Sequence, residues 1–194
     1  MKHDAIRMII IDDIKLIVEG IAKRIPWKEH GITLSATAMN GSDGLEKITQ
    51  FKPHIVITDI RMPKINGLTM IARALEHVPN IKIIIISGYP DFEYAQQALK
   101  LGAYDYITKP FTFEQLEEIV LRAKEEIEKD EAKELQFYEL ESKVRESLPA
   151  LRQEYMQFLI RYSTSEKKVR AKWEFLEVNL ALDQLAVMVV EMDD

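Results

Sequence analysis

Acidic, hydroxyl and ammonium side chains follow the apolar runs of this 194-residue chain. Asp12 and Asp13 come directly after "MIII", Asp59 ends the stretch "IVITD", Ser87 follows "IKIIII", and Lys109 follows "YDYIT". Three carboxylates that converge in one crevice resist joint ionisation unless a divalent cation neutralises them. Since the chain has no cysteine and hard oxygen ligands favour Mg²⁺ or Mn²⁺, these residues predict a magnesium site.

These five residues together also have the composition of a phosphoryl-transfer site. The metal would neutralise phosphoryl oxygens, while Lys109 and the Ser87 hydroxyl would contact the others. Asp59, held between a metal and an ammonium group, is then a competent nucleophile for phosphorus. Taken singly, each residue has a simpler interpretation. An aspartate after a strand is usually a turn residue or helix cap, Ser87 is typical of a turn, and Lys109 is typical of a solvated surface. Only their joint arrangement favours chemistry.

The elements that must position these residues are short apolar runs alternating with segments of helical spacing, over about the first 125 residues. Continuous runs at 8–11, 55–57 and 81–86 are typical of strands covered on both faces. A mixed run at 32–38 predicts an edge strand, and 104–107 is a weaker fifth strand. The alternation predicts an α/β fold with a parallel sheet, in which ligands bind at the carboxyl ends of the strands.

A long helix is predicted after this region, because the chain runs from Thr112 to about Glu146 without glycine or proline. Positions at alternating spacings of four and three predict a coiled-coil-like seam, weakened by three acidic residues. The alternative is a solvated helix that packs only at its first turns. The seam comprises Leu116, Val120, Ala123, Ile127, Asp130, Glu134, Phe137, Glu141 and Val144.

The C-terminal part of the chain predicts further elements. Pro149 predicts an interruption, after which "PALRQEYMQFLI" restarts a helix. Ser163 and Glu166 predict a capping box for another helix. The run at 185–190 predicts a strand, which needs a sheet to join. We therefore expect the chain to stop just inside a second domain, or this strand to pair with another chain.

Three parts follow from this reading. They are a domain over 1–127, a linker helix over 128–148 and a helical segment with the first strand of a truncated domain over 149–194.

The composition is that of a globular protein, with 47% hydrophobic and 30% charged residues. The net charge of −6 gives this chain no basic surface for nucleic acid. Without cysteine there is no disulfide framework. Acidic residues occur so early in the N-terminal sequence that no apolar signal segment is expected there. No apolar run approaches the roughly 20 residues of a membrane span. We expect a cytoplasmic location and no membrane partner.

Several stretches resemble the receiver domain of two-component response regulators, over roughly residues 5–127. They are "IIIDD", "ITDIRMPKINGL" and "IISGYPDFEYAQQALKLGAYDYITKPF". Together with "PWKEHGI", they resemble in particular the receivers that precede an AraC-type DNA-binding domain. The tail from about Leu135 is similar to the intermediate region of some of those regulators. The resemblance implies a flavodoxin-like, doubly wound five-stranded parallel sheet of order 2-1-3-4-5, with a long C-terminal helical extension and the start of a second domain.

The resemblance also implies the roles of the acidic residues. Asp59 would accept a phosphoryl group from a sensor histidine kinase. Asp12, Asp13, Asp59 and the backbone carbonyl of Arg61 would bind Mg²⁺. Many receivers have a third acidic residue after the pair where this chain has Ile14. Because that third residue is usually not a metal ligand, the departure leaves the predicted metal site intact.

The remaining roles concern the response to phosphorylation. Ser87 would contact the phosphoryl group, Lys109 would pair with it, and Tyr106 would change rotamer on activation. The resemblance further implies a homodimer on activation and DNA binding through a C-terminal domain outside this chain. Such a protein is not an enzyme beyond slow self-dephosphorylation.

Two other classes use similar parts. A phosphatase of the haloacid dehalogenase kind also has a strand-end aspartate, a hydroxyl, a lysine and Mg²⁺. It needs an acid two residues after the nucleophile to protonate the leaving group, and here that residue is Arg61, which disfavours this class. The second alternative is a dimerisation module whose acidic pocket is never phosphorylated.

Overall fold

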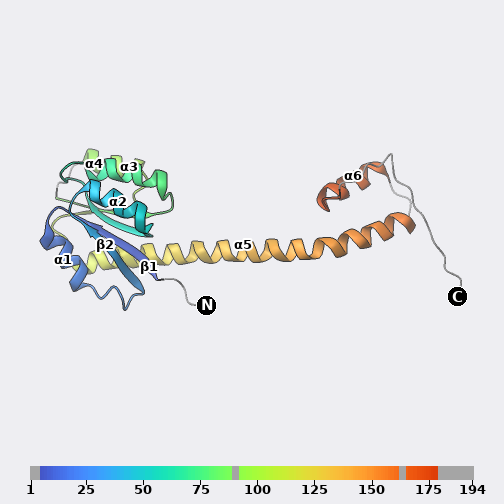
Figure 1. The fold of residues 1–194 in the computed structure, drawn as a ribbon, viewed down its shortest axis with the longest axis horizontal. Helices are drawn as coiled ribbons and strands as arrows, with labels where there is room; N and C mark the ends of the chain where they lie inside the picture. Colours follow the sequence, from blue (N-terminus) through green and yellow to red (C-terminus); the bar gives the residue numbers. More distant parts are fainter. Residues whose placement is uncertain (1–4, 89–91, 162–164, 179–194) are drawn as a thin grey trace. The chain divides into compact units, whose positions relative to one another are not determined.

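The computed structural model describes residues 5–88, 92–161 and 165–178. They divide into two compact units, 1–131 and 132–194. Figure 1 labels the elements in chain order. These are β1 (Ile6–Ile11), α1 (Lys15–Arg24), β2 (Ile32–Ala38), α2 (Gly41–Phe51), β3 (Ile55–Asp59), α3 (Gly67–His77), β4 (Lys82–Ser87), α4 (Phe92–Lys100), β5 (Asp105–Thr108), α5 (Phe113–Arg161) and α6 (Glu166–Phe175).

The first unit is built on one parallel sheet in which the strands lie in the order β2-β1-β3-β4-β5. Both the predicted α/β class and the predicted strand order are confirmed. The mixed run at 32–38 forms the edge strand β2, as expected. The strand order reverses between β1 and β3, so the crevice at their carboxyl ends is the topological switch point where ligands of such sheets bind.

The continuous isoleucine runs are explained by helices on both faces of the sheet. In β3, Ile55 and Ile57 join the core beneath α1 and α5. Val56, between them, joins the opposite core, beneath α2, α3 and α4. Figure 1 shows the same division, with α2, α3 and α4 on one side of the sheet and α1 on the other. Since successive side chains point to opposite faces, both sets must be apolar.

The long helix α5 begins at a capping box, as Thr112 predicts. The Thr112 hydroxyl accepts a hydrogen bond from the Gln115 amide at 3.2 Å, and the Gln115 side chain accepts one from the Thr112 amide at 3.0 Å. Two backbone donors that the helix itself cannot satisfy are thereby paired. Four residues at three- and four-residue spacing then pack on the sheet, and they are Leu116, Val120, Ala123 and Ile127.

The predicted interruption at Pro149 is wrong, because α5 continues through it to Arg161. A proline inside a helix removes one backbone hydrogen bond and costs about 3 kcal/mol. Tertiary contacts are present in the turn after the proline. The Arg152 guanidinium donates from Nε to the carbonyl of Leu176 at 2.5 Å and also contacts the Glu177 carboxylate at 3.2 Å. These contacts join the turn after the proline to the residues that follow α6.

The structure describes only part of the region of two predictions, the helix cap at Ser163 and the strand at 185–190. The helix α6 follows Ser165, which takes the N-cap position without a side-chain cap hydrogen bond. The predicted cap Ser163 lies outside the described residues, and so does the predicted strand at 185–190. Within the ranges that the structure covers, no helix combines the length and apolar character needed to cross a membrane.

The packing of α5 on the sheet predicts that Leu116→Ala destabilises the first unit by about 2–5 kcal/mol, because a fully buried side chain leaves a cavity. Urea unfolding followed by the fluorescence of buried Trp27, in a Trp173→Phe background, measures this change. Leu135→Ala is the matched control on the same helix and is expected within about 0.5 kcal/mol, because Leu135 is exposed. Equal effects would contradict the packing described.

Candidate functional site

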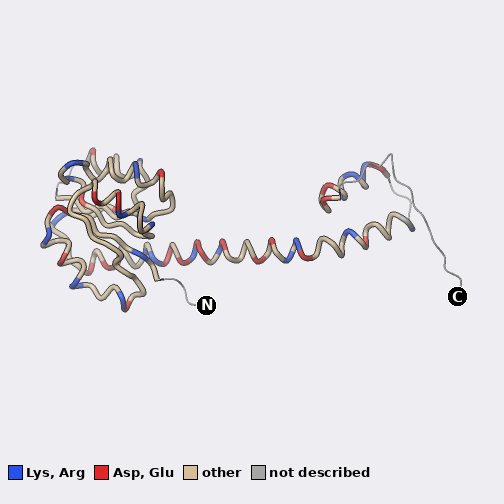
Figure 2. Tube along the Cα trace, in the orientation of Figure 1, with Lys and Arg blue, Asp and Glu red and all other residues tan. Residues whose placement is uncertain are grey.

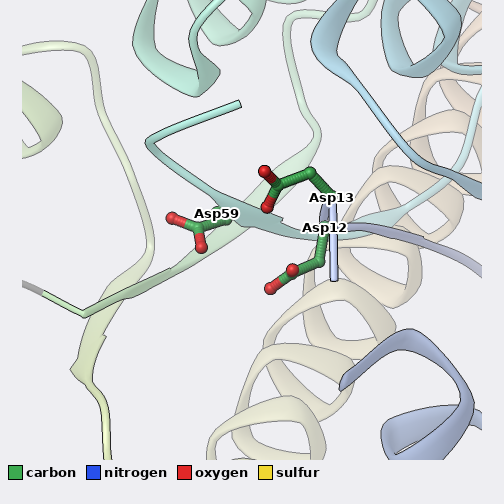
Figure 3. Close-up of side chains that lie close together, drawn as sticks. All are labelled: Asp12, Asp13 and Asp59. Atoms are coloured by element: carbon green, nitrogen blue, oxygen red, sulfur yellow. The ribbon is translucent and has the colours of Figure 1, made fainter. Parts of the chain in front are cut away.

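Three carboxylates meet at the carboxyl ends of β1 and β3 (Figure 3). Asp12 and Asp13 follow the last residue of β1, and Asp59 is the last residue of β3. One oxygen from each carboxylate lies within 4.8 Å of the others. Asp12 is 2% exposed and Asp59 8%, whereas Asp13 faces solvent. The parallel pairing of β1 with β3 therefore brings together residues that lie 46 or 47 positions apart in the sequence.

Lys109 supplies the positive charge next to these carboxylates. Its ammonium Nζ lies 2.6 Å from Asp59 Oδ2 and 2.9 Å from Asp12 Oδ2. The Lys109 side chain is itself 18% exposed, so both ion pairs are largely shielded from water. Charge-assisted hydrogen bonds of this kind are short and strong, and removing one partner leaves the other charge buried without compensation.

The protonation behaviour of the cluster follows from its burial. Desolvation raises the pKa of Asp12, and the hydrogen bonds from the Ile14 amide and from Lys109 only partly oppose it. Burial by itself lowers the pKa of Lys109, but the carboxylates of Asp59 and Asp12 outweigh it, and the pKa is raised. Lys109 is thus a permanent cation at neutral pH. A further positive charge beside Asp12 would favour its ionised form.

Backbone amide groups fix the orientation of the two buried carboxylates. Asp12 Oδ1 accepts a hydrogen bond from the amide of Ile14 at 2.8 Å. Asp59 Oδ1 accepts one from the amide of Arg61 at 3.1 Å. In each carboxylate, one oxygen accepts a hydrogen bond from the backbone amide two residues later in the sequence, and the other oxygen binds the Lys109 ammonium. The carboxylates are therefore preorganised.

The donor set fits a small hard cation. In an octahedral site with Mg–O distances near 2.1 Å, ligand oxygens on opposite sides are about 4.2 Å apart. Neighbouring ligand oxygens in such a site are about 3.0 Å apart. The oxygens of Asp12, Asp13 and Asp59 lie within 4.8 Å of one another, so the three carboxylates would draw together around an ion. The peptide of Arg61 lies in the loop whose amide binds Asp59. Its carbonyl as a ligand remains a prediction.

Ser87 and Tyr106 lie at different positions relative to the acidic cluster. Ser87 ends β4, is 1% exposed, and its carbonyl accepts a hydrogen bond from the Lys109 amide at 2.7 Å. This bond joins the ends of β4 and β5. Tyr106 pairs with Ile85 in the sheet and is half-buried against the core beneath α2, α3 and α4. The structure therefore gathers Asp12, Asp13, Asp59 and Lys109, sets Ser87 beside Lys109 and places Tyr106 outside the cluster.

A glycine that is absent from the predicted site residues supports the position of Asp59. Gly67 is the first residue of α3, and a Cβ built on it would lie 2.1 Å from the Asp59 carbonyl oxygen. Its amide donates to the carbonyl of Ile60 at 2.7 Å. The preceding Asn66 caps α3 by accepting from the amide of Thr69. The Asn-Gly dipeptide was the available signal, because only glycine allows this close approach.

Comparisons with known proteins find relatives of the first unit. Residues 8–121 match the model of the response regulator receiver domain. The chain is 38% identical over 122 residues to the uncharacterized transcriptional regulatory protein YesN of Bacillus subtilis, covering 61% of this chain and 33% of that protein. It thus spans about a third of YesN's length.

Solved structures resemble the chain as well. The receiver domain of AraT, a response regulator of Geobacillus stearothermophilus, has a TM-score of 0.62 and 35% identity, covering 66% of this chain and 98% of that chain. The CheX–CheY–BeF₃–Mg²⁺ complex of Borrelia burgdorferi has a TM-score of 0.56 and 25% identity, covering 60% of this chain and 87% of that chain.

The close contact at Gly67 predicts that Gly67→Ala destabilises the protein by about 1–3 kcal/mol, because the added Cβ would collide with backbone that cannot move freely. Thermal unfolding measures the effect. Gly88→Ala is the matched control, since a Cβ there would meet only the Lys109 side chain at 3.9 Å. A Gly67→Ala protein as stable as the control would show that the loop is not constrained by this approach.

Proposed function

Because the chain belongs to the response regulator receiver domain family, we propose that Asp59 accepts a phosphoryl group from a sensor histidine kinase in a Mg²⁺-dependent reaction. One observation carries this proposal. The Lys109 ammonium bridges Asp59 and Asp12 within a cluster of three carboxylates at the switch point of the sheet. Phosphoryl transfer depends on positioning and charge neutralisation, and this cluster provides both.

In the proposed reaction, an oxygen of the Asp59 carboxylate attacks the phosphorus of a phosphohistidine. The new O–P bond forms as the P–N bond breaks, and the leaving imidazole nitrogen keeps the electron pair. A divalent cation held by Asp12, Asp13, Asp59 and the Arg61 carbonyl would neutralise charge on the transferring group. Lys109 would move from Asp59 Oδ2 to a phosphoryl oxygen.

The donor chemistry and a relative support the metal. The pKa of Asp12 is raised by burial, so a bound cation would offset the cost of keeping this carboxylate ionised. The solved complex that contains the CheY of Borrelia burgdorferi is named with both BeF₃ and Mg²⁺. By chemical type, the oxygens that this chain presents are suited to Mg²⁺, with Mn²⁺ as a substitute.

Phosphorylation would act as a switch through the strand ends. A phosphoryl group carries about −1.5 to −2 charges and would draw the Ser87 hydroxyl and Lys109 toward it. Because the Ser87 carbonyl binds the Lys109 amide, the ends of β4 and β5 would respond together. Tyr106, one position along β5 from Asp105, would then change rotamer. The proposed consequence is homodimerisation through the face formed by α4, β5 and the first turns of α5.

The proposed output is control of transcription through a DNA-binding region outside this chain. The name of YesN, a transcriptional regulatory protein, supports it. An output domain of AraC type is the form that we propose. The two alternatives, a haloacid dehalogenase-like phosphatase and an unphosphorylated dimerisation module, are less consistent with family membership and with Arg61 two positions after Asp59.

Incubation with Mg²⁺ and acetyl phosphate is expected to add one phosphoryl group to the chain, measured by intact mass. Asp59→Asn should abolish the adduct, because an amide is not a nucleophile for phosphorus. Asp105→Asn, which alters a carboxylate outside the cluster, is the matched control and should retain it. No adduct on the wild-type chain would leave the unphosphorylated module, and repeated turnover of acetyl phosphate would indicate the phosphatase.

An exposed apolar surface beside the site suits a docking phosphodonor protein. Ile14 directly follows the acidic pair and is 49% exposed, and Leu16 is 81% exposed at the start of α1. A groove of about 430 Å³ runs between α1 and the start of α5, lined in part by Leu16, Phe111 and Phe113. Because these residues border the end of the sheet that carries Asp59, we propose that the kinase's histidine-bearing helix docks here.

Leu16→Arg is therefore expected to slow phosphoryl transfer from a histidine kinase by about tenfold, the equivalent of about 1.4 kcal/mol of lost docking energy. Transfer from acetyl phosphate should be unchanged, because the small donor needs no docking surface. Radiolabel transfer from the autophosphorylated kinase provides the measurement. Leu99→Arg, on α4 and also strongly exposed, is the control. Equal slowing by both variants would rule out the surface on α1.

A further inference from the structure

A groove in the second unit lies between the last turns of α5 and the helix α6. It has a volume of about 360 Å³, and it is lined by Leu151, Glu154, Tyr155, Phe158 and Lys172. Leu151 and Phe158 are each 41% exposed, and the rings of Tyr155 and Phe158 stack at 5.9 Å. Apolar surface that collects in a groove marks a contact with a further segment or partner.

A buried donor in α6 indicates that such a contact brings a hydrogen-bond acceptor. Trp173 directly follows the groove residue Lys172 and is 4% exposed. Its indole N–H finds no acceptor within 5–88, 92–161 and 165–178. Buried N–H groups are nearly always paired, and one left unpaired costs about 1–3 kcal/mol. A carbonyl from a segment outside these ranges would complete the bond.

The chain itself continues from a point next to this donor. Val178, the last described residue, donates its amide to the carbonyl of Trp173 at 2.9 Å, so the chain leaves the described region beside the end of α6. Six residues, 179–184, precede the apolar run 185–190, and they span at most about 20 Å. The ten residues of α6 measure about 15 Å. The run can therefore lie along α6.

The remaining segment complements the groove and α6 in chemistry. Residues 185–190, "LAVMVV", are all apolar. The charged residues of 179–194 are all acidic, and they are Asp183, Glu191, Asp193 and Asp194. In α6 basic residues outnumber acidic ones (Figure 2), with Lys167, Lys168, Arg170 and Lys172 against Glu166 and Glu174. Apolar surface and opposite net charge both favour contact.

We propose that residues 185–190 of this chain bind in the groove between α5 and α6. Their side chains would cover Leu151 and Phe158, and a backbone carbonyl of the segment would accept the hydrogen bond from Trp173. A strand by itself is unstable, and packing against helices supplies the apolar contact that it needs. The inference concerns the second unit alone and does not depend on phosphorylation of Asp59.

Engineered cysteines test the position of the segment, because the chain has none of its own. Glu154→Cys leaves the apolar lining intact and is combined with Val187→Cys or with Met188→Cys, since neighbouring side chains of a strand point to opposite faces. One of the two double variants should form a disulfide within a single full-length chain. Intact mass after alkylation of free thiols measures it. Such a bond requires Cα atoms within about 7 Å of each other.

Glu134→Cys with Val187→Cys and with Met188→Cys gives the matched controls. Position 134 is exposed on the same helix, about 30 Å before position 154, so these pairs should stay reduced. Equal oxidation of test and control pairs, or no disulfide in either test pair, overturns the proposal. Disulfides that only link two chains would show that a second copy occupies the groove, and they overturn it as well.

The two indole N–H groups of the chain provide a second measurement. The Trp27 N–H donates to the carbonyl of Ile21 at 2.8 Å in the first unit and is the internal control. The double variant Val187→Asp, Met188→Asp should speed hydrogen exchange of the Trp173 N–H at least about tenfold, because charges on both faces of the strand keep it out of the groove. Exchange at Trp27 should not change. Unchanged exchange at Trp173, followed by nuclear magnetic resonance, overturns the proposal.

Discussion

The placement of one ammonium group between two buried carboxylates is the constraint on which the site depends. Asp12 and Asp59 are almost fully shielded from water, and two such charges side by side would be costly without Lys109. The three residues come from the ends of β1, β3 and the segment after β5. They meet only if all three strands run in the same direction with the register that the sheet shows. The charge cluster therefore requires the parallel fold.

Much of the fold could be predicted because its signals are local. Continuous isoleucine runs identify strands covered on both faces, and the mixed pattern of 32–38 identifies the edge. The residues of the site could also be predicted, because each follows a strand in a parallel sheet. The contacts between these residues could not be predicted. The bridge that Lys109 forms between two carboxylates depends on side-chain conformation, and the need for glycine at position 67 depends on the close approach of a distant part of the backbone.

The error at Pro149 has a physical cause of a different kind. Propensity rules describe a helix by itself, and by those rules a proline in its interior ends it. Here the turn after the proline is bound through Arg152 to the carbonyl of Leu176, a tertiary contact that propensity rules leave out. The two units differ in how α5 is packed. In the first unit Leu116 and Val120 are buried in the core beneath α1 and α5, whereas in the second unit Phe137 and Val144 are exposed.

The contacts of Lys109 suit the switch proposed for phosphorylation of Asp59. Its ammonium binds Asp59, while its amide binds the carbonyl of Ser87, so a single residue joins the reacting carboxylate to the ends of β4 and β5. A phosphoryl group would extend the negative charge beyond the present position of Asp59 Oδ2, and Lys109 would follow it. Since Ser87 and Lys109 are coupled through the backbone, that movement would not remain local. The strands that carry Ser87 and Tyr106 are hydrogen-bonded neighbours, and in the proposed switch their shared edge would connect the site to the α4–β5–α5 face.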